Sequence, residues 1–409
     1  MERLTSAVGL FAMIGFAWLL SSHKNKISWR VVVGGMALQF GLGLLVLRTD
    51  WGGWIFEKAG KVFEALLDCV NVGSIGVFGS SYEDHFIAFK VLPTIICFSA
   101  FMSILYYLGI VQVLVRGVAW IMQKTLGTSG AESLSAAANI FVGQTEAPLV
   151  IRPYVSSMTQ SELMSVMVGG FATIAGGVLA AYIDMEIDAS HLLTASVISA
   201  PAALLIAKVL QPEVEEPKTL GNVTVEVQRT ATNFLEAAGN GAIDGLKLAL
   251  NVGAMLIVFV ALVAVVNALI AWFCQAIGVE AWTFQKIVGL GFYPFAWLMG
   301  IPQQDCWVAG ELLGTKMILN EFVAYQELGN IIKPPKGTEA VRQLTERSQT
   351  ILTYALCGFA NISSIGIQLG GIGGIAPDRK SDLAKLAFRA MLGGTLAAFM
   401  TACIAGILL

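Results

Sequence analysis

Long apolar segments joined by short polar loops make up most of the 409-residue chain. A helix needs about 17–25 predominantly apolar residues to cross the hydrocarbon core of a bilayer. About eight segments approach or meet this length, namely residues 6–20, 29–47, 86–108, 163–183, 192–210, 246–273, 351–372 and 383–409. The pattern therefore predicts an all-α membrane protein with about eight transmembrane helices.

Two further apolar stretches, residues 134–155 and 287–325, are interrupted by Gly and Pro. The first contains Gly-Gln-Thr-Glu-Ala-Pro-Leu at residues 143–149, and the second contains Met-Gly-Ile-Pro at residues 299–302. Irregular backbone at membrane depth is tolerated only where it is buried in protein or lines a cavity. We therefore expect two re-entrant hairpins in place of straight spans.

Two of the remaining segments predict interfacial helices, and the distribution of basic residues in the loops predicts the orientation of the chain in the membrane. Residues 49–77 and 109–126 mix Trp, Lys and Arg with apolar residues, which is typical of amphipathic helices in the membrane interface. The basic loop 21–30 is expected in the cytoplasm, because short cytoplasmic loops are rich in Lys and Arg. Both termini then lie outside, and the polar stretch 211–236 is a cytoplasmic linker. The basic loop 333–347 does not fit this orientation.

The order hairpin, broken span, span occurs twice and divides the chain into four parts. Residues 1–130 are expected to hold scaffold and interfacial helices, 131–210 the first transport repeat, 211–280 the linker and a scaffold span, and 281–409 the second transport repeat. In the orientation above, the two hairpins enter from opposite sides, so the repeats are inverted. Inverted repeats with discontinuous helices are typical of secondary transporters, whose binding sites lie near the bilayer midplane.

The composition agrees with a polytopic membrane protein. Hydrophobic residues make up 56% of the chain and charged residues only 13%, with a mean hydropathy of +0.73, whereas soluble domains average about 25% charged residues. The net charge of −3 argues against a nucleic-acid partner. The six cysteines are scattered singly, without metal-ligand spacing or a disulfide framework, so we expect buried thiols and no cofactor.

Polar residues interrupt the apolar pattern at four places, residues 143–148, 172–178, 320–322 and 358–366. These four polar breaks contain two carboxylates, Glu146 and Glu321, with several amides and hydroxyls. A carboxylate can accept hydrogen bonds from two vicinal hydroxyls, and an amide both donates and accepts. Because the breaks contain no Arg or Lys, they suit a small, uncharged, hydroxyl-rich solute better than an anion.

Structural roles are the alternative for these residues, although an ionisable group at membrane depth is functional by default. Glu146 could pair with Arg152 across the hairpin turn, and Thr173 could bond its own helix. Glu321 could reach water near the end of its hairpin. An intramembrane enzyme is a minor alternative, because the chain lacks His-Glu-x-x-His and Gly-x-Ser-x-Gly motifs. A channel would need the four breaks to line an open pore.

Three motifs together resemble the concentrative nucleoside transporter family. They are Gly-Gln-Thr-Glu-Ala-Pro-Leu at 143–149, Asn-Glu-Phe-Val-Ala-Tyr at 320–325 and Gly-Phe-Ala-Asn-Ile-Ser-Ser-Ile-Gly at 358–366. The resemblance covers essentially the whole chain in order and spacing, and its length is similar to the bacterial eight-span members. It implies a multi-pass protein of the bacterial inner membrane, a homotrimer in which a scaffold holds a mobile transport domain that moves like an elevator.

The resemblance also implies the ligands of the site. A nucleoside such as uridine would contact Gln144, Thr145, Glu146, Val178, Glu321, Phe359, Asn361 and Ser364. Of these, Gln144, Thr145 and Glu146 would face the nucleobase, and Glu321 would bind the ribose hydroxyls. A sodium ion would be held by the Asn139 side chain, the Val142 carbonyl, the Thr173 hydroxyl and the Ile174 carbonyl. The expected function is sodium-driven nucleoside import. A proton-coupled symporter is the alternative, because bacterial relatives include both kinds.

Overall fold

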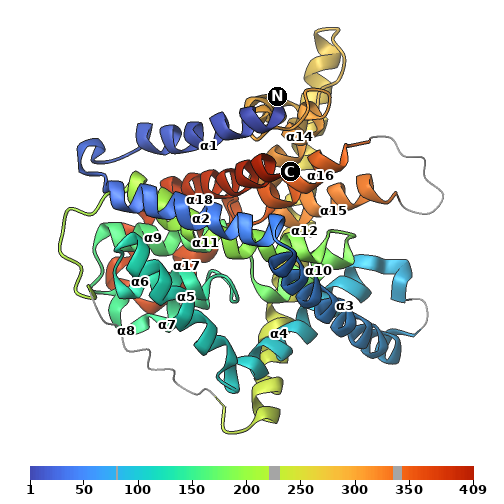
Figure 1. Cartoon of the computed structure of the whole chain (residues 1–409). Coiled ribbons are helices and arrows are strands. Elements are labelled where there is room, and N and C mark those ends of the chain that lie inside the picture. Colours follow the sequence, from blue (N-terminus) through green and yellow to red (C-terminus); the bar gives the residue numbers. More distant parts are fainter. Residues whose placement is uncertain (80–81, 221–230, 335–342) are drawn as a thin grey trace.

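The computed structural model describes residues 1–79, 82–220, 231–334 and 343–409, and every regular element in these ranges is a helix (Figure 1). Outside the hairpins and broken spans, the α-helices are α1 (Glu2–Leu19), α2 (Trp29–Arg48), α3 (Asp50–Phe78), α4 (Leu92–Tyr107), α5 (Ile110–Leu126), α11 (Ala189–Leu210), α12 (Phe234–Ala276), α13 (Phe284–Leu298) and α18 (Lys380–Leu408). A π-helical turn, Phe86–Val91, leads into α4. The predicted all-α class is confirmed.

The first hairpin and both broken spans form where the sequence predicts them. The hairpin enters as α6 (Gly130–Ala138) and returns through the short helices α7 (Ala147–Val150) and α8 (Arg152–Val155). The broken spans are two helix pairs, α9 (Gln160–Ala172) with α10 (Gly176–Asp184), and α16 (Glu346–Leu356) with α17 (Ile362–Ile375). Each pair is separated by a few non-helical residues, which leave backbone groups available for ligands.

The second hairpin lies one helix later than the sequence indicated. The break at residues 299–302 separates α13 from α14 (Cys306–Ile318), and these two helices pack along each other. The polar turn, however, joins α14 to α15 (Glu321–Ile332) and contains Asn320. The hairpin that carries the candidate carboxylate Glu321 is therefore α14–α15. The predicted range, residues 287–325, is wrong: it begins one helix too early and ends before α15 is complete.

Seven helical runs within the described ranges are long and apolar enough to cross a membrane. The remaining predicted span, residues 351–372, is divided between α16 and α17 by its break. Helix α12 has 43 residues and is therefore longer than the predicted span at residues 246–273. At 1.5 Å per residue it is about 65 Å long, roughly twice the thickness of a hydrocarbon core. It begins inside the stretch 211–236 that was expected to be a linker.

The core lies among α9, α11 and α18, which are buried along most of their length at the centre of the molecule (Figure 1). Helices α1 and α2 pack along α18 and α11. By contrast, α12 is largely exposed and packs mainly against α4. Gly245 permits this contact, since a Cβ there would lie 2.7 Å from the Cβ of Ser99. Small residues at such crossings let membrane helices approach closely.

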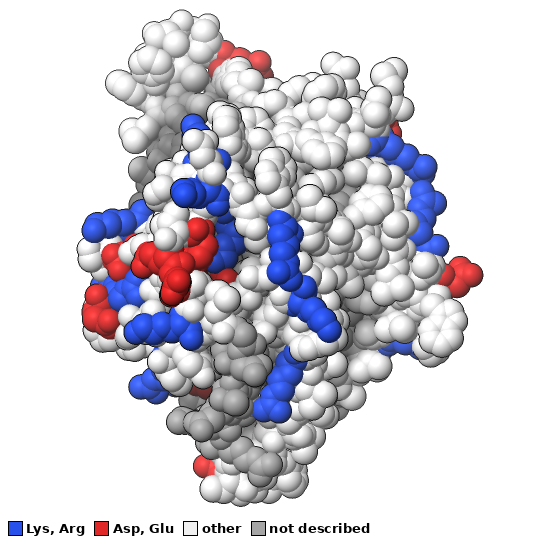
Figure 2. Space-filling view, turned by 60° about the vertical axis from the view of Figure 1, so that its left-hand side comes forward, with Lys and Arg blue, Asp and Glu red and all other residues white. Residues whose placement is uncertain are grey.

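The two ends of the helices define two faces. Arg3 donates to the carbonyl of Leu409, so both termini share one face, which we call the terminal face. On the opposite face, Arg389 donates to the carbonyls of Leu20 and Leu210 at 3.1 and 2.6 Å. Figure 2 shows charged side chains grouped in clusters, beside broad surface that carries neither charge, as expected where lipid covers the protein.

The hairpins enter from opposite faces. At the base of the first hairpin, the Gly130 N–H donates to the carbonyl of Thr219 at 2.9 Å, in the stretch that follows α11 on the opposite face. At the base of the second hairpin, Asp305 accepts from the backbone and hydroxyl of Thr345 at 3.0 and 2.7 Å. Thr345 lies two residues before Arg347, which donates to the carbonyl of Gly406 near the C-terminus. The inverted arrangement of the two hairpins is thus confirmed.

Candidate functional site

The hairpin turns and the two helix breaks meet inside the molecule. The Gly176 N–H of the first break donates to the carbonyl of Phe141 in the first hairpin turn at 3.2 Å. The Phe359 N–H of the second break donates to the carbonyl of Thr173 in the first break at 3.3 Å. Backbone groups that a continuous helix would have used are therefore satisfied between the breaks, as a buried irregular backbone requires.

Glu321 is the centre of one polar cluster. Its side chain is buried at the first turn of α15, with a relative exposure of 5%. The Tyr182 hydroxyl donates to its Oε1 at 3.0 Å, and the Asn361 Nδ2 donates to its Oε2 at 2.9 Å. Asn361 also caps α17, since its Oδ1 accepts from the Ser364 N–H at 2.9 Å. A carboxylate held by two donors still has lone pairs for the hydroxyls of a solute.

A second polar cluster joins the first hairpin turn to α17. The Gln144 Nε2 lies 3.4 Å from the Ser364 hydroxyl, and the Gln368 Nε2 donates to the Gln144 Oε1 at 3.1 Å. Gln368 is fully buried and also donates to the carbonyl of Met167. These contacts fix the Gln144 amide so that its NH₂ group, the donor end, points toward Ser364.

The remaining predicted substrate residues surround these clusters. Val178 is buried in the first turn of α10, and Phe359 is half-buried in the second break. Glu146 is exposed, and its carboxylate accepts from the Thr145 hydroxyl at 3.0 Å. Glu146 and Arg152, both in the described ranges, form no ion pair with each other, so the structural alternative for Glu146 is not supported.

The predicted sodium ligands lie at the first turn and the first break. Asn139 is fully buried, and neither its Oδ1 nor its Nδ2 has a hydrogen-bond partner within the described residues. The Thr173 hydroxyl donates to the carbonyl of Gly169 at 2.9 Å, which leaves its oxygen free to accept a cation. Val142 and Ile174 both lie in non-helical backbone, three residues after Asn139 and directly after Thr173. Buried amides are normally satisfied, so the Asn139 oxygen fits a monovalent cation.

Sequence analysis missed three polar residues of this region: Tyr182, Gln368 and Lys316. Tyr182 lies one helical turn after Val178 and therefore shares its face, a spacing that could have revealed it. Gln368 lies four residues after Ser364, so the same helical spacing could have revealed it. Lys316 is a lone cation in the apolar helix α14, and an ionisable residue at membrane depth is a functional candidate in itself.

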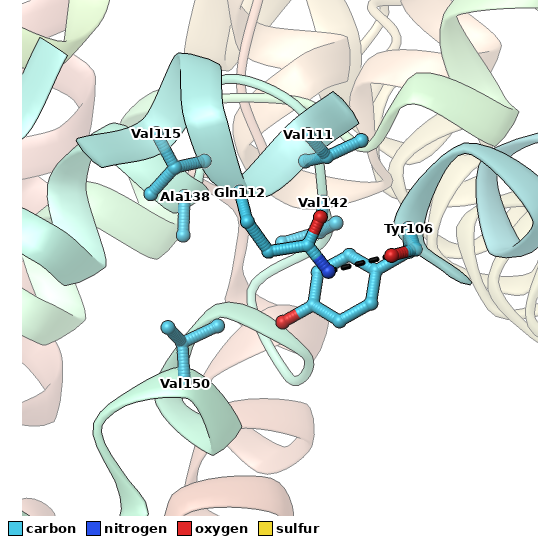
Figure 3. A pocket seen from close by; sticks show the side chains of 7 residues that line it. All are labelled: Tyr106, Val111, Gln112, Val115, Ala138, Val142 and Val150. Carbon is cyan, nitrogen blue, oxygen red and sulfur yellow. Dashed lines mark hydrogen bonds between the residues drawn. The ribbon is translucent and has the colours of Figure 1, made fainter. Parts of the chain in front are cut away.

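A small apolar hollow lies beside the first hairpin and not at the polar clusters. It is lined by Tyr106, Val111, Gln112, Val115, Ala138, Val142 and Val150 (Figure 3). Gln112 is the one polar side chain among them besides Tyr106, and its Nε2 donates to the Tyr106 carbonyl at 2.6 Å. Within the described ranges, no three His, Cys, Asp or Glu side chains gather to hold a metal ion. This hollow is therefore separate from the polar clusters of the turns and breaks.

Comparison with known protein families identifies three matching segments. Residues 191–406 match the C-terminal part of a Na⁺-dependent nucleoside transporter family, and residues 8–81 match its N-terminal part. Residues 88–185 match a family described as nucleoside recognition. The three matches together contain all of the predicted site residues.

Individual relatives agree with these matches. Solute carrier family 28 member 3 of Rattus norvegicus is 47% identical over 414 aligned residues, which cover 100% of this chain and 59% of the relative. Sodium/nucleoside cotransporter 1 of the same species is 45% identical, covering 100% of this chain and 64% of that protein. The chain thus spans less than two thirds of these curated relatives.

A solved structure matches along nearly its whole length. The structure of CNTnw in an inward-facing substrate-bound state has a TM-score of 0.92 and 41% sequence identity, covering 100% of this chain and 98% of that chain. CNTnw has also been solved in outward-facing and intermediate states, which match with TM-scores between 0.91 and 0.93.

Proposed function

Because this chain belongs to the concentrative nucleoside transporter family, we propose that it is a secondary active symporter that imports nucleosides on a sodium gradient. The observation that carries the proposal is the buried Glu321 carboxylate, which is oriented by Tyr182 and Asn361 where hairpin turn and helix break meet. Its free lone pairs accept from the vicinal hydroxyls of ribose. The Gln144 cluster, held by Gln368, binds the nucleobase edge together with Thr145, Glu146 and Val178. Asn361 and Ser364 complete the sugar site, with Phe359 nearby.

Sodium is the proposed coupling ion. The unpartnered Asn139 side chain and the Thr173 hydroxyl supply neutral oxygens, and the carbonyls of Val142 and Ile174 complete the set. Asn139 and Gln144 lie in the same hairpin turn. If the bound ion orders this turn, it also orders Gln144, a side chain that binds the nucleobase. Binding of one ligand then favours binding of the other, which is the reciprocity that symport requires.

An elevator movement fits the way the helices pack. We assign the two hairpins and two broken spans to a mobile transport domain, and the α4–α12 pair to the scaffold. The pair meets the rest of the protein mainly through α10. CNTnw, which matches over the whole chain, has been solved in both inward-facing and outward-facing states. The proposal includes a homotrimer in the bacterial inner membrane, with both termini outside.

Uptake into proteoliposomes tests the function and the ion together. With purified protein, radiolabelled uridine should accumulate above equilibrium under an inward sodium gradient at fixed pH. A proton gradient in sodium-free buffer should not drive accumulation. Accumulation under the proton gradient alone would favour the proton-coupled alternative, and equilibration without accumulation under either gradient would refute symport.

The variant Thr173→Val tests the ion ligands. Loss of the hydroxyl oxygen should raise the sodium concentration for half-maximal uptake by about tenfold, the equivalent of about 1.4 kcal/mol. Thr194→Val is the matched control, because Thr194 is also buried and also donates to a carbonyl of its own helix, outside the predicted ion site. Equal sodium dependence in the two variants would exclude Thr173 as a ligand.

A further inference from the structure

Asp184, the last residue of α10, makes two polar contacts at the start of α4. Its Oδ1 lies 3.4 Å from the Nζ of Lys90, which is in the π-helical turn before α4. Its Oδ2 accepts from the hydroxyl of Thr94, in the first turn of α4, at 2.9 Å. The side chain of Asp184 has a relative exposure of 5% and that of Lys90 has 21%. A largely buried ion pair, with a hydrogen bond beside it, thus joins α10 of the proposed transport domain to the proposed scaffold.

Elsewhere α10 and α4 meet through small and apolar residues. A Cβ at Gly177 would lie 3.1 Å from the Ser99 Oγ, so the two helices cross with little side chain between them. Further along α10, Ala180 packs in an apolar cluster with Phe98 of α4, and Ile183 packs against the same cluster. Apolar contact is non-directional, so a surface of this kind does not by itself hold α10 at one position along α4.

The contacts of Asp184, by contrast, are directional. Hydrogen bonds and charge-assisted contacts need separations of about 3 Å, so a shift of α10 by a few ångströms breaks both. The hydroxyl of Thr94 keeps a partner after such a shift, because it also lies 2.9 Å from the Lys90 carbonyl in its own helical turn. Asp184 loses both partners, and a buried carboxylate without its cation is strongly unfavourable. The contact therefore favours one position of α10, and Thr94 can exchange one acceptor for the other.

We propose that the contact of Asp184 with Lys90 and Thr94 is an end stop of the transport movement. It holds α10 at one limit of its travel along α4, and it is released when the transport domain moves. The proposal rests on the proposed function, since it takes α10 as mobile and α4 as fixed. It makes the described arrangement one discrete state of the cycle, whose population depends on the strength of this contact.

The rate of disulfide formation between α10 and α4 measures how often α10 occupies the described position. Gly177→Cys and Ser99→Cys supply the two thiols, which are within disulfide reach in this arrangement. Alanine replaces Cys69 and Cys97, the two native cysteines that are not buried. The rate is followed in purified protein under a mild oxidant. The reaction of each single-cysteine protein with a maleimide corrects for changes in thiol reactivity.

Charge reversal in this background tests the end stop. Lys90→Glu places two carboxylates against each other and should slow disulfide formation by at least about threefold, because the described state becomes less populated. The charge-exchanged variant Lys90→Glu/Asp184→Lys restores the attraction and should return the rate to within about twofold of the starting protein. Lys333→Glu is the matched control: it makes the same change in charge at an exposed ion pair with Glu186, two residues after Asp184, within the proposed transport domain. Its rate should stay unchanged.

Two outcomes would overturn the end stop. One is an equal rate in Lys90→Glu and Lys333→Glu, and the other is a charge-exchanged variant as slow as Lys90→Glu. If Lys90→Glu does not fold, Lys90→Gln takes its place, with slower disulfide formation expected and an unchanged rate again overturning the proposal.

Uridine uptake by the cross-linked protein separates the end stop from its premise. Full uptake with the Gly177–Ser99 disulfide formed would show that α10 does not move along α4, and would refute the proposed division into a scaffold and a moving domain. Abolished uptake, together with a disulfide rate that Lys90→Glu leaves unchanged, would refute the end stop alone.

Discussion

At the scale of single residues, the candidate site is built largely from helix N-termini. Asn361 caps α17, and Asn320 caps α15, where its Oδ1 accepts from the Val323 N–H at 3.0 Å. Glu321 follows Asn320 directly and so lies at the positive end of the α15 dipole. The capping side chains thus end the breaks and also place the proposed substrate ligands.

Glu321→Gln tests the sugar contact most directly. Replacing the carboxylate should remove charge-assisted hydrogen bonds worth about 1.5–3 kcal/mol and weaken uridine binding by at least about tenfold. Binding of 2′,3′-dideoxyuridine, which lacks both hydroxyls, should change much less. Kd values from isothermal titration calorimetry would check this, with Glu327→Gln on the same helix as the control. An equal loss for both nucleosides would contradict a contact with the hydroxyls.

Sequence alone could predict candidate residues in the breaks and in the first turns of the helices that follow them, but it missed those deeper in the helices. Glu321, Asn361, Gln144 and Asn139 stand out because polar side chains interrupt an apolar run. Tyr182 lies within the apolar helix α10, where only its position one helical turn after Val178 indicated it. Which helix face meets the site depends on tertiary packing, and the contact of Tyr182 with Glu321 joins elements that are far apart in the chain.

At the scale of elements, Gly and Pro residues predicted the position of one hairpin turn but not of the other. They correctly marked the first hairpin turn, but in the second repeat they marked the connection between α13 and α14. The true turn at Asn320 contains neither residue, since a capping Asn side chain can end a helix and begin the next. The sequence could thus predict that hairpins exist, whereas their register needed the structure.

A cross-link between α4 and α10 tests the division into a scaffold and a moving domain. A Cβ at Gly177 of α10 would lie 3.1 Å from the Ser99 Oγ of α4, so Gly177→Cys and Ser99→Cys are within disulfide reach. If α10 moves relative to α4, oxidation should abolish uridine uptake and reduction should restore it. Cys69 and Cys97 would first be replaced by alanine, because the other four cysteines are buried.

A second pair within the proposed scaffold is the control for this cross-link. A Cβ at Gly253 of α12 would lie 3.7 Å from the Leu92 Cδ1 of α4. Gly253→Cys and Leu92→Cys, joined by a short bifunctional thiol reagent, should leave uptake unchanged, because the α4–α12 pair is expected to stay together. Full uptake by the oxidised Gly177/Ser99 pair would instead place α10 in the scaffold.

At the scale of the whole molecule, the structure relates the polar loops to two faces. Glu186, in the turn before α11, and Lys333, at the end of α15, form an ion pair at 2.7 Å on the terminal face. The predicted cytoplasmic loop at residues 21–30 lies on the opposite face, since the Ser22 N–H donates to the carbonyl of Leu210 at 2.9 Å. These relative positions agree with the topology derived from the sequence, including the placement of Lys333, the first residue of the basic loop, with the termini.

The absolute orientation is the remaining prediction for the whole molecule. Lys333 is exposed on the terminal face and Lys24 is exposed on the opposite face. In a background without Cys69, Lys333→Cys should react with a membrane-impermeant maleimide in intact cells, whereas Lys24→Cys should react only after permeabilisation. This result follows from the positive-inside rule applied to the first loop, because orientation is set mainly by basic residues close to the first spans. The reverse result would show that the protein has the opposite orientation in the membrane, with the two hairpins still entering from opposite sides. Reaction of both positions in intact cells would contradict the two-face assignment itself.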